Sequence, residues 1–154
     1  MLSMDKIIEL CKEVGNDLGK GYSEHVYQEG IAVLLRQNKI NYSKEVTLSI
    51  FFKGLVIGTV RADIVIPDEQ IIIECKAIDN ELRVNCLPQL VNYLKLTNYD
   101  QGIFVNFNQN PSKKMVDIIK MCRCTFDKTL YEVFINDKDP IYIDNTGMLV
   151  ANDS

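Results

Sequence analysis

Hydrophobic side chains recur every three to four residues in the first quarter of the chain, a spacing typical of amphipathic helices. The first apolar stripe is Met4, Ile7, Ile8, Cys11, Val14 and Leu18. Gly19 and Gly21 follow it, so we expect the first helix to end there. A second helix is predicted from Ser23, as its N-cap, to about Asn38. Its apolar stripe is Val26, Tyr27, Gly30, Ile31, Leu34 and Leu35.

The next part of the chain changes to alternating apolar and polar residues, the period of β-strands. Residues 44–52 alternate in this way, and Lys53-Gly54 suits a tight turn to a returning strand at residues 55–66. A four-residue interruption at 67–70 then leads into a third apolar segment, residues 71–77. Three consecutive antiparallel strands are predicted.

A helix and a buried strand are predicted after a loop at residues 79–85 that carries Glu81 and Arg83. Pro88 fits the first turn of a helix that continues to about Thr97. The nearly continuous apolar run at 102–107 predicts a buried strand, parallel to a neighbour because the helix supplies the crossover.

The last third of the chain is predicted to begin with another helix at Pro111. The residues expected to face inward from it are Met115, Ile118, Ile119 and Cys122. A strand at about 130–135 and a terminal hairpin turning at 144–147 complete the pattern.

The hairpin of residues 61–77 carries an unusual charged face. If Ile66 pairs with Ile71, antiparallel counting places Asp63 opposite Glu74 and Arg61 opposite Lys76. The apolar face would then consist of Ile64, Ile66, Ile71, Ile73 and Cys75. Cross-strand ion pairs on a solvated surface are one interpretation. The other is a metal-dependent phosphodiesterase site, in which two carboxylates offer hard oxygen ligands beside a cation.

Glu24 is a second unexpected acid. It precedes Tyr27 and Ile31 by three and seven residues, which places it on the inward side of the first helical turn. It either complements the helix N-terminus or serves a site. Gln89 and Tyr93, four residues apart, share one face of their helix.

Composition narrows the class of protein. With 154 residues, 47% of them hydrophobic, the chain is expected to form a single domain, residues 1–154. The net charge of −4 argues against a protein held to nucleic acid by bulk positive charge, and leaves a local basic groove open. No apolar run is long enough to span a membrane and no signal-type block begins the chain, so we expect a soluble, intracellular protein without a membrane partner. Five cysteines without paired spacing and one histidine favour reduced thiols over a disulfide scaffold or a zinc site.

Four motifs in order give the sequence a family resemblance. They are GYSEHVY at 21–27, RAD at 61–63, ECK at 74–76 and QLVNYL at 89–94. Together, over about residues 7–107, they resemble the GxxExxY family of PD-(D/E)xK nucleases, with a Gln-x-x-x-Tyr element similar to that of RecB-like and lambda-exonuclease-like members. The resemblance implies an α/β fold with α+β character: a restriction-endonuclease-like core of about residues 7–122, with a central mixed β-sheet flanked by helices, and peripheral strands at 126–150.

The resemblance also implies roles for individual residues. Asp63 and Glu74 would be the principal ligands of Mg²⁺ or Mn²⁺, with the Cys75 carbonyl, and Glu24 would reach the same site. Lys76 would position or help to deprotonate the attacking water. Gln89 and Tyr93 would hold Lys76 or the phosphate, and Arg61 would contact the substrate. The iron–sulfur cluster of some relatives is not expected, because the cysteine spacing is poor and the set is incomplete.

Three functions from different classes remain open at this point. The first is a metal-dependent nuclease acting on DNA, whether single-stranded, duplex or branched. The second is a catalytically weak or inactive module of the same fold that binds nucleic acid or a protein. The third is a metal-dependent hydrolase of another phosphate ester. The sequence also leaves open whether the chain forms a homo-oligomer.

Overall fold

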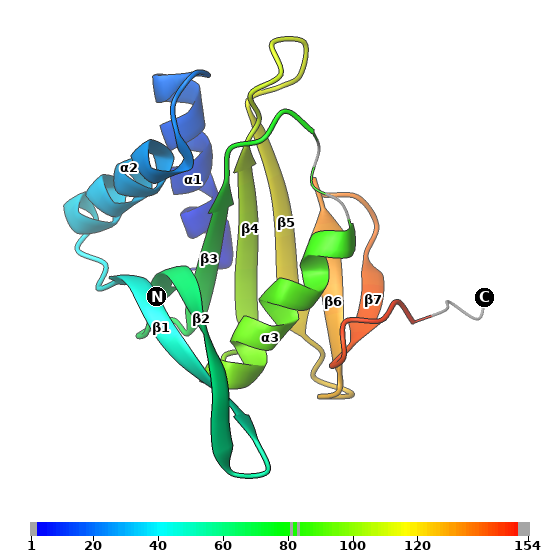
Figure 1. Cartoon of the computed structure of the whole chain (residues 1–154). Coiled ribbons are helices and arrows are strands. Elements are labelled where there is room, and N and C mark those ends of the chain that lie inside the picture. Colours follow the sequence, from blue (N-terminus) through cyan, green and yellow to red (C-terminus); the bar gives the residue numbers. More distant parts are fainter. Residues whose placement is uncertain (1–2, 81, 83, 151–154) are drawn as a thin grey trace.

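The computed structural model describes residues 3–80, 82 and 84–150. Within that part, helices and strands follow one another along a single mixed sheet (Figure 1). The helices are α1 (Met4–Leu18), α2 (Glu24–Gln37), the 3₁₀ turn η1 (Val84–Cys86) and α3 (Leu87–Thr97). The strands are β1 (Ser43–Phe52), β2 (Leu55–Ile66), β3 (Ile71–Lys76), β4 (Gln101–Phe107), β5 (Val116–Arg123), β6 (Leu130–Ile135) and β7 (Ile141–Asp144).

The sheet has seven strands in the order of the sequence, β1 to β7. Strands β3 and β4 run parallel, and each of the other neighbouring pairs is antiparallel. The parallel pair follows from α3, which crosses the sheet between them as the connecting helix. The mixed sheet flanked by helices confirms the predicted fold class.

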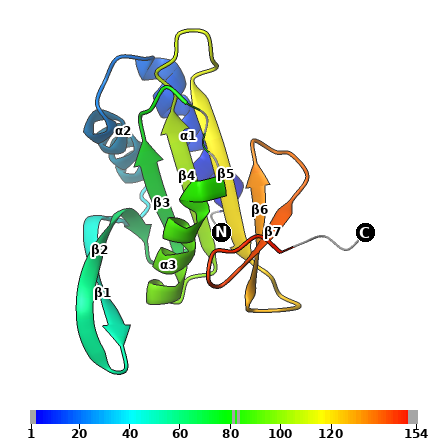
Figure 2. The ribbon, with the colours of Figure 1, turned by 45° about the vertical axis from the view of Figure 1, so that its right-hand side comes forward.

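Helices cover both faces of the sheet, as Figures 1 and 2 show: α1 and α2 lie on one face and α3 on the other. Each face of the sheet has its own hydrophobic core, and successive side chains of β3 point into one core and then the other. Ile71, Ile73 and Cys75 pack with α1 and α2. Ile72 packs with α3. The approach of α3 to β4 is close, since a Cβ on Gly102 would lie only 2.8 Å from Leu90 Cδ1.

The two N-terminal helices form as predicted. Helix α1 ends at Gly19, whose φ of 72° is in the range that favours glycine, and α2 begins directly after Ser23. Ser23 occupies the N-cap position, although its side chain makes no capping hydrogen bond. The predicted strands and turns between residues 43 and 76 are also present, and so is the predicted α3. Glu81 and Arg83 of the loop at 79–85 lie outside the described residues.

The helix predicted from Pro111 is wrong. Residues 116–123 are instead β5, paired antiparallel with β4. Ile118 packs in the core with α1 and α2, and Ile119 packs in the core with α3. A strand covered on both faces is apolar on both faces, so it loses the period-two signal, and its apolar spacing can be mistaken for that of a helix.

The hairpin of β2 and β3 is confirmed in its register and corrected in its length. Ile64 pairs with Ile73, Val65 with Ile72 and Ile66 with Ile71, as antiparallel counting predicts. The pairing stops there, however, and Arg61 pairs with Thr47 of β1 rather than with Lys76. Strand β2 therefore leaves β3 at Asp63 and continues outward with β1 (Figure 1).

Strands β6 and β7 extend the sheet beyond β5, and their side chains Tyr131, Val133 and Ile143 contribute to the core beneath α3. The predicted terminal turn is present, because the Gly147 N–H donates to the Asp144 carbonyl. In the described part of the chain, no helix is both long and apolar enough to cross a bilayer.

Candidate active site

Asp63 and Glu74 interlock where β2 separates from β3. Glu74 Oε1 accepts a hydrogen bond of 2.8 Å from the Asp63 N–H. Asp63 Oδ2 accepts one of 2.8 Å from the Cys75 N–H. The two side chains thus bind main-chain donors of the opposite strand at the point where the regular ladder ends, and this fixes both carboxylates in place.

The surroundings of Asp63 and Glu74 disfavour two bare negative charges, and so favour binding of a proton or a metal cation. Burial, followed by repulsion from Asp63, raises the pKa of Glu74 to about 8. Burial also raises the pKa of Asp63, although the Cys75 N–H and the charge of Lys76 act in the opposite direction. Negative charge at this site is therefore incompletely compensated by the protein.

Lys76 ends β3 on the same side of the sheet. Its Nζ lies 5.9 Å from the centroid of the Phe104 ring, and Phe104 belongs to the core beneath α3. The side chain is half-buried, and its positive charge lowers the pKa values of Asp63 and Glu74. Lys76 therefore places a positive charge beside the two acids.

Glu24 lies at the first turn of α2 and within electrostatic range of the same group. Its side chain is exposed, so Glu24 lies at the rim of the site and not on the buried face of the helix, where the sequence predicted it. Burial of part of the carboxyl and the charge of Asp63 raise its pKa, and Lys76 lowers it. The structure thus brings a third acid toward the pair from a different element.

Helix α3 contributes a hydrogen-bonded chain to the site. Gln89 Nε2 donates to Tyr93 Oη at 2.9 Å, and Tyr93 Oη donates to the Arg61 carbonyl at 3.1 Å. Burial and the charge of Glu74 raise the pKa of Tyr93, which places this ring near the acids. Arg61 itself is exposed, and its guanidinium lowers the pKa of Asp63. The structure therefore brings the predicted residues together around the point where β2 separates from β3.

Tyr27 has a role that the sequence did not reveal. Its ring stacks on Phe107 with centroids 4.5 Å apart, and its Oη donates to the Gly19 carbonyl at 2.7 Å. Gln109 closes this arrangement, because its Nε2 donates to Tyr27 Oη at 3.0 Å and its Oε1 accepts from the Gly21 N–H at 2.7 Å. Gly21 has a φ of 107°, which favours glycine there. These contacts fix the loop between α1 and α2, which leads directly into Glu24 at the start of α2.

A buried polar cluster behind Lys76 was also missed. Asp117 accepts hydrogen bonds from the side chains of Asn106 at 3.3 Å and Asn108 at 3.0 Å. Asn106 in turn accepts from the Ile78 N–H at 3.0 Å and donates to the Asn80 carbonyl at 3.0 Å. The cluster holds the chain that follows Lys76. Asparagines alternating at the end of an otherwise apolar run were the signal that could have identified it.

The donor set fits a hard divalent cation. Asp63 and Glu74 offer carboxylate oxygens, and one oxygen of each is fixed by a main-chain N–H. A cation there would offset the repulsion that raises the pKa of Glu74. No group of three or more His, Cys, Asp or Glu side chains is close enough to form a metal cluster in the described ranges. Asp63, Glu74 and the Cys75 carbonyl are the oxygen donors here that could hold such an ion.

The thiol of Cys75 is unsuited to chemistry at this site. It faces the core with α1 and α2, where burial raises its pKa well above the ordinary value. Burial likewise raises the pKa of Cys11 to about 12. Neither group is a candidate nucleophile at neutral pH.

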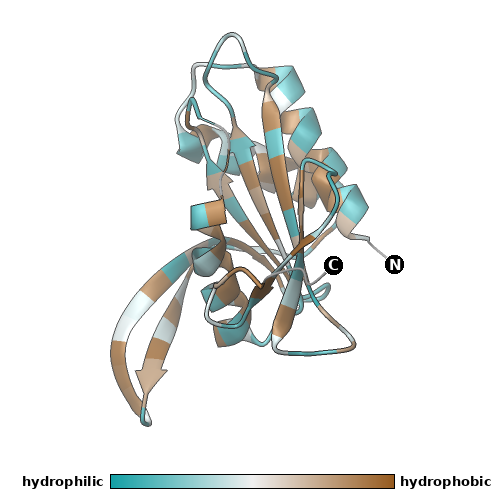
Figure 3. Cartoon of the chain, turned by 90° about the vertical axis from the view of Figure 1, so that its right-hand side faces the viewer, coloured by the Kyte–Doolittle hydropathy of each residue, from teal (hydrophilic) through white to brown (hydrophobic). Residues whose placement is uncertain are grey.

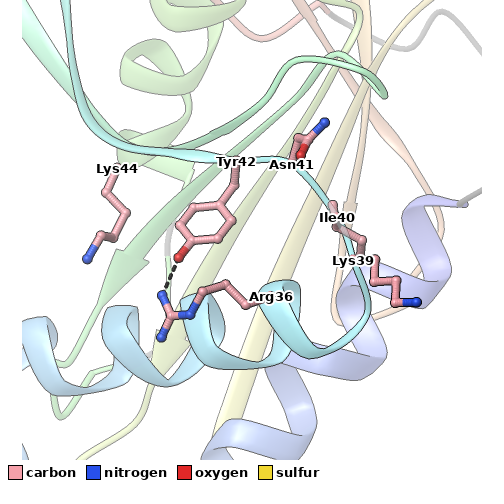
Figure 4. A pocket seen from close by; sticks show the side chains of 6 residues that line it. All are labelled: Arg36, Lys39, Ile40, Asn41, Tyr42 and Lys44. Atoms are coloured by element: carbon pink, nitrogen blue, oxygen red, sulfur yellow. Dashed lines mark hydrogen bonds between the residues drawn. The ribbon is translucent and has the colours of Figure 1, made fainter.

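A separate basic hollow of about 550 Å³ lies between the end of α2 and the start of β1 (Figure 4). Its lining residues are Arg36, Lys39, Ile40, Asn41, Tyr42 and Lys44. The Arg36 guanidinium donates to Tyr42 Oη, and Lys44 Nζ forms an ion pair of 2.6 Å with Glu29. None of the predicted site residues lines it, so we do not assign the chemistry to this hollow.

Comparison with known proteins gives a family and a related structure. Residues 2–118 match the family described as the PD-(D/E)XK nuclease superfamily. Among solved structures, the chain is similar to the crystal structure of SSO0001, with 25% sequence identity and a TM-score of 0.47 over 62% of this chain and 48% of that chain. The similarity thus spans about half the length of that protein. A search of curated proteins gives no match.

Proposed function

Because the chain belongs to the PD-(D/E)XK nuclease superfamily, we propose that it is a metal-dependent nuclease that hydrolyses DNA phosphodiester bonds with water. The observation that carries the proposal is the interlocked pair of Asp63 and Glu74 beside Lys76. Two fixed carboxylates with uncompensated charge suit a divalent ion, and the adjacent cation suits a phosphate.

In the proposed site, Asp63, Glu74 and the Cys75 carbonyl hold Mg²⁺ or Mn²⁺, and Glu24 acts from the rim. The bound ion supplies Lewis-acid charge for the phosphodiester. Lys76 orients the attacking water and offsets the charge that develops on the phosphate. Gln89 and Tyr93 hold the scissile strand or Lys76, and Arg61 contacts the DNA backbone from β2. The hydrogen bonds from Gln89 to Tyr93 and from Tyr93 to the Arg61 carbonyl support this grouping.

Within the superfamily, the chain belongs in our proposal to the GxxExxY group. The three named positions of this motif have separable roles in the fold. Gly21 permits a positive φ, Glu24 projects toward Asp63 and Lys76, and Tyr27 anchors the loop. We also place the protein inside the cell. The support is the set of five cysteines, an odd number without paired spacing, which suits a reducing compartment better than a disulfide scaffold.

The test is a cleavage assay on single-stranded, duplex and branched DNA, with Mg²⁺ or Mn²⁺ and with a chelator. Asp63→Asn is the critical variant, because asparagine still offers an oxygen to the Cys75 N–H while it removes the charge. Asp68→Asn is the matched control, since Asp68 lies in the turn of the same hairpin and bonds only Asn41 among the described residues.

Metal-dependent cleavage by the wild type and by Asp68→Asn, with loss in Asp63→Asn, supports the proposal. DNA binding without cleavage in any metal would identify a binding module. Hydrolysis of simple phosphate esters with DNA left intact would identify a different hydrolase.

A further inference from the structure

The outer part of the β1–β2 hairpin, residues 50–58, is an apolar projection that we call the arm. It extends beyond the rest of the sheet in Figures 1 and 2, and its strands carry hydrophobic segments toward the tip in Figure 3. Five large apolar side chains are between 56% and 70% exposed there: Phe51, Phe52, Leu55, Val56 and Ile57. Neighbouring hydrophobic side chains with this exposure mark an interaction surface.

At the base of the same hairpin, helix α3 covers the apolar side chains of β1 and β2. Val46, Leu48 and Val60 pack against the core beneath α3. Beyond them, Ile50 and Phe51 line a hollow of about 240 Å³ whose other side is the end of α3, at Asn92, Lys95 and Leu96. The apolar stripe therefore continues past the last element of this chain that covers it.

Strand β1 also presents an unprotected edge. It stands at one end of the strand order, so its outer backbone groups face no strand among the described residues. Residues 46–52 contain neither a proline nor a charged side chain, the usual devices that prevent edge pairing. At the other end, β7 has only four residues, and the returning chain covers it through the bridge of Ile143 and Leu149. The two edges of one sheet thus differ.

The chemistry of the arm excludes a nucleic-acid backbone as its natural occupant. Lys53 is the single charged residue between positions 46 and 60. Phosphate binding depends on several lysines or arginines, which this segment lacks. An occupant must instead offer an unpaired strand edge and apolar side chains.

A second copy of this chain offers both. An antiparallel pair of β1 strands about a twofold axis is self-complementary, because each strand presents the same row of donors and acceptors to the other. Successive side chains of a strand point to opposite faces, so an edge partner covers only some of the five arm side chains, at on the order of 100 Å² each. The buried apolar area is therefore that of a weak interface, which main-chain hydrogen bonds along the two β1 edges supplement, and the dimer should form at high protein concentration.

We propose that the arm is a dimerisation element in which the β1 edges of two copies pair antiparallel, so that the apolar tip of each arm packs beside the base of the partner's arm. The proposal is independent of the nuclease assignment. It predicts a four-stranded arm shared by two domains, each with its own acidic site. Strand β2 carries both the arm and Asp63, so the shared arm would connect the two sites through one strand per copy.

The mass in solution tests the proposal, measured by light scattering and sedimentation from about 1 to about 100 μM protein. We expect twice the chain mass of 17.6 kDa at the upper end. Phe52→Lys with Leu55→Lys should raise the dimer dissociation constant at least about a hundredfold, because the interface would then bury four charges. Both side chains are exposed in the single copy, at 59% and 70%, so the fold should be retained by circular dichroism.

Phe126→Lys is the matched control, since this phenylalanine is 73% exposed in the turn between β5 and β6, far from the β1 edge in the strand order. It should leave the dimer intact. A second readout is hydrogen exchange, in which amides of residues 46–52 should become protected as protein concentration rises. A wild type that stays monomeric throughout overturns the proposal. Arm variants of such a monomer that lose DNA binding would assign the arm to nucleic acid.

Discussion

The carboxylates of Asp63 and Glu74 each accept a hydrogen bond from a main-chain N–H of the opposite strand, and both bonds are 2.8 Å long. The side chains thus occupy the place where the next ladder bonds would form, and β2 can leave β3 without exposing unpaired donors. One pair of residues therefore ends the hairpin, directs β2 outward with β1, and fixes two acids side by side. Fold and site depend on the same two hydrogen bonds.

The first prediction concerns pH. The pKa of Glu74 rises from 4.5 in a free side chain to about 8 in the folded protein. The folded state therefore binds a proton more tightly than the unfolded state, and the resulting stabilisation is fully present below about pH 4.5 and lost as pH rises through about 8. In the presence of a chelator, the free energy of unfolding should fall between about pH 5 and about pH 9.

Denaturant titrations at a series of pH values measure this dependence. Glu74→Gln should flatten it over that range, whereas Glu9→Gln, which changes an exposed acid on α1, should leave it unchanged. Divalent-ion affinity should rise over the same range, because the ion competes with the Glu74 proton. An identical pH profile in the wild type and Glu74→Gln would remove Glu74 as its source.

A second prediction separates two roles of Glu24. In the proposed site, Glu24→Gln removes a negative charge near Asp63 and should weaken Mg²⁺ or Mn²⁺ binding, measured by calorimetry or by the metal-induced rise in melting temperature. If the residue only complements the helix N-terminus, Glu24→Gln should lower the free energy of unfolding by a few tenths of a kcal/mol to about 1 kcal/mol. The affinity for metal should then be unchanged. Glu29→Gln on the same helix is the control, because Glu29 pairs with Lys44 instead.

The hairpin and the helices were predictable from the sequence because their signals are local. A four-residue turn and a period of two fix the pairing of Ile64 with Ile73, and glycine ends α1. The end of that pairing was not predictable. It depends on where the side chains of Asp63 and Glu74 find hydrogen-bond donors, and alternation alone does not contain this information.

The rest of the site depends on contacts between distant parts of the chain. Gln109 bonds Tyr27 across 82 positions, so no window of sequence contains both. Strand β5 was mistaken for a helix because Ile118 and Ile119 are buried on opposite faces. The motifs at Gly21, Asp63 and Glu74 identified which residues to expect together, but not the network that holds them.

A third prediction concerns that network. Tyr27→Phe keeps the ring on Phe107 but removes the hydroxyl that joins Gly19 to Gln109. The free energy of unfolding should fall by about 1 kcal/mol, because partly buried partners lose a hydrogen bond. Tyr22→Phe is the control, since Tyr22 is 49% exposed. Urea titration measures the difference, and equal stability of the two variants would contradict the structural role of the hydroxyl.

A fourth prediction is a stabilising substitution. Gln28 is only 4% exposed, and its Nε2 has no hydrogen-bond partner in the described part of the chain. Gln28→Met has a similar shape without the polar atom, so it should raise the free energy of unfolding by about 1 kcal/mol. Gln37→Met, at the exposed end of the same helix, should have little effect. A loss of stability in Gln28→Met would indicate that the amide has a partner in solution.

The last prediction concerns Lys76, which ends β3 beside both acids. In the proposed site its ammonium group acts as a fixed positive charge that orients the water and offsets charge on the phosphate. Lys76→Ala should retain metal binding and most DNA binding, yet lose turnover by at least about a hundredfold, the order expected for one preorganised catalytic group. Lys76→Arg should restore only part of the rate, because a planar guanidinium does not replace a compact ammonium. Single-turnover cleavage measures the rates, with the exposed Lys128→Ala as control. Equal cleavage by Lys76→Ala and the wild type would show that the reaction does not occur at this hairpin.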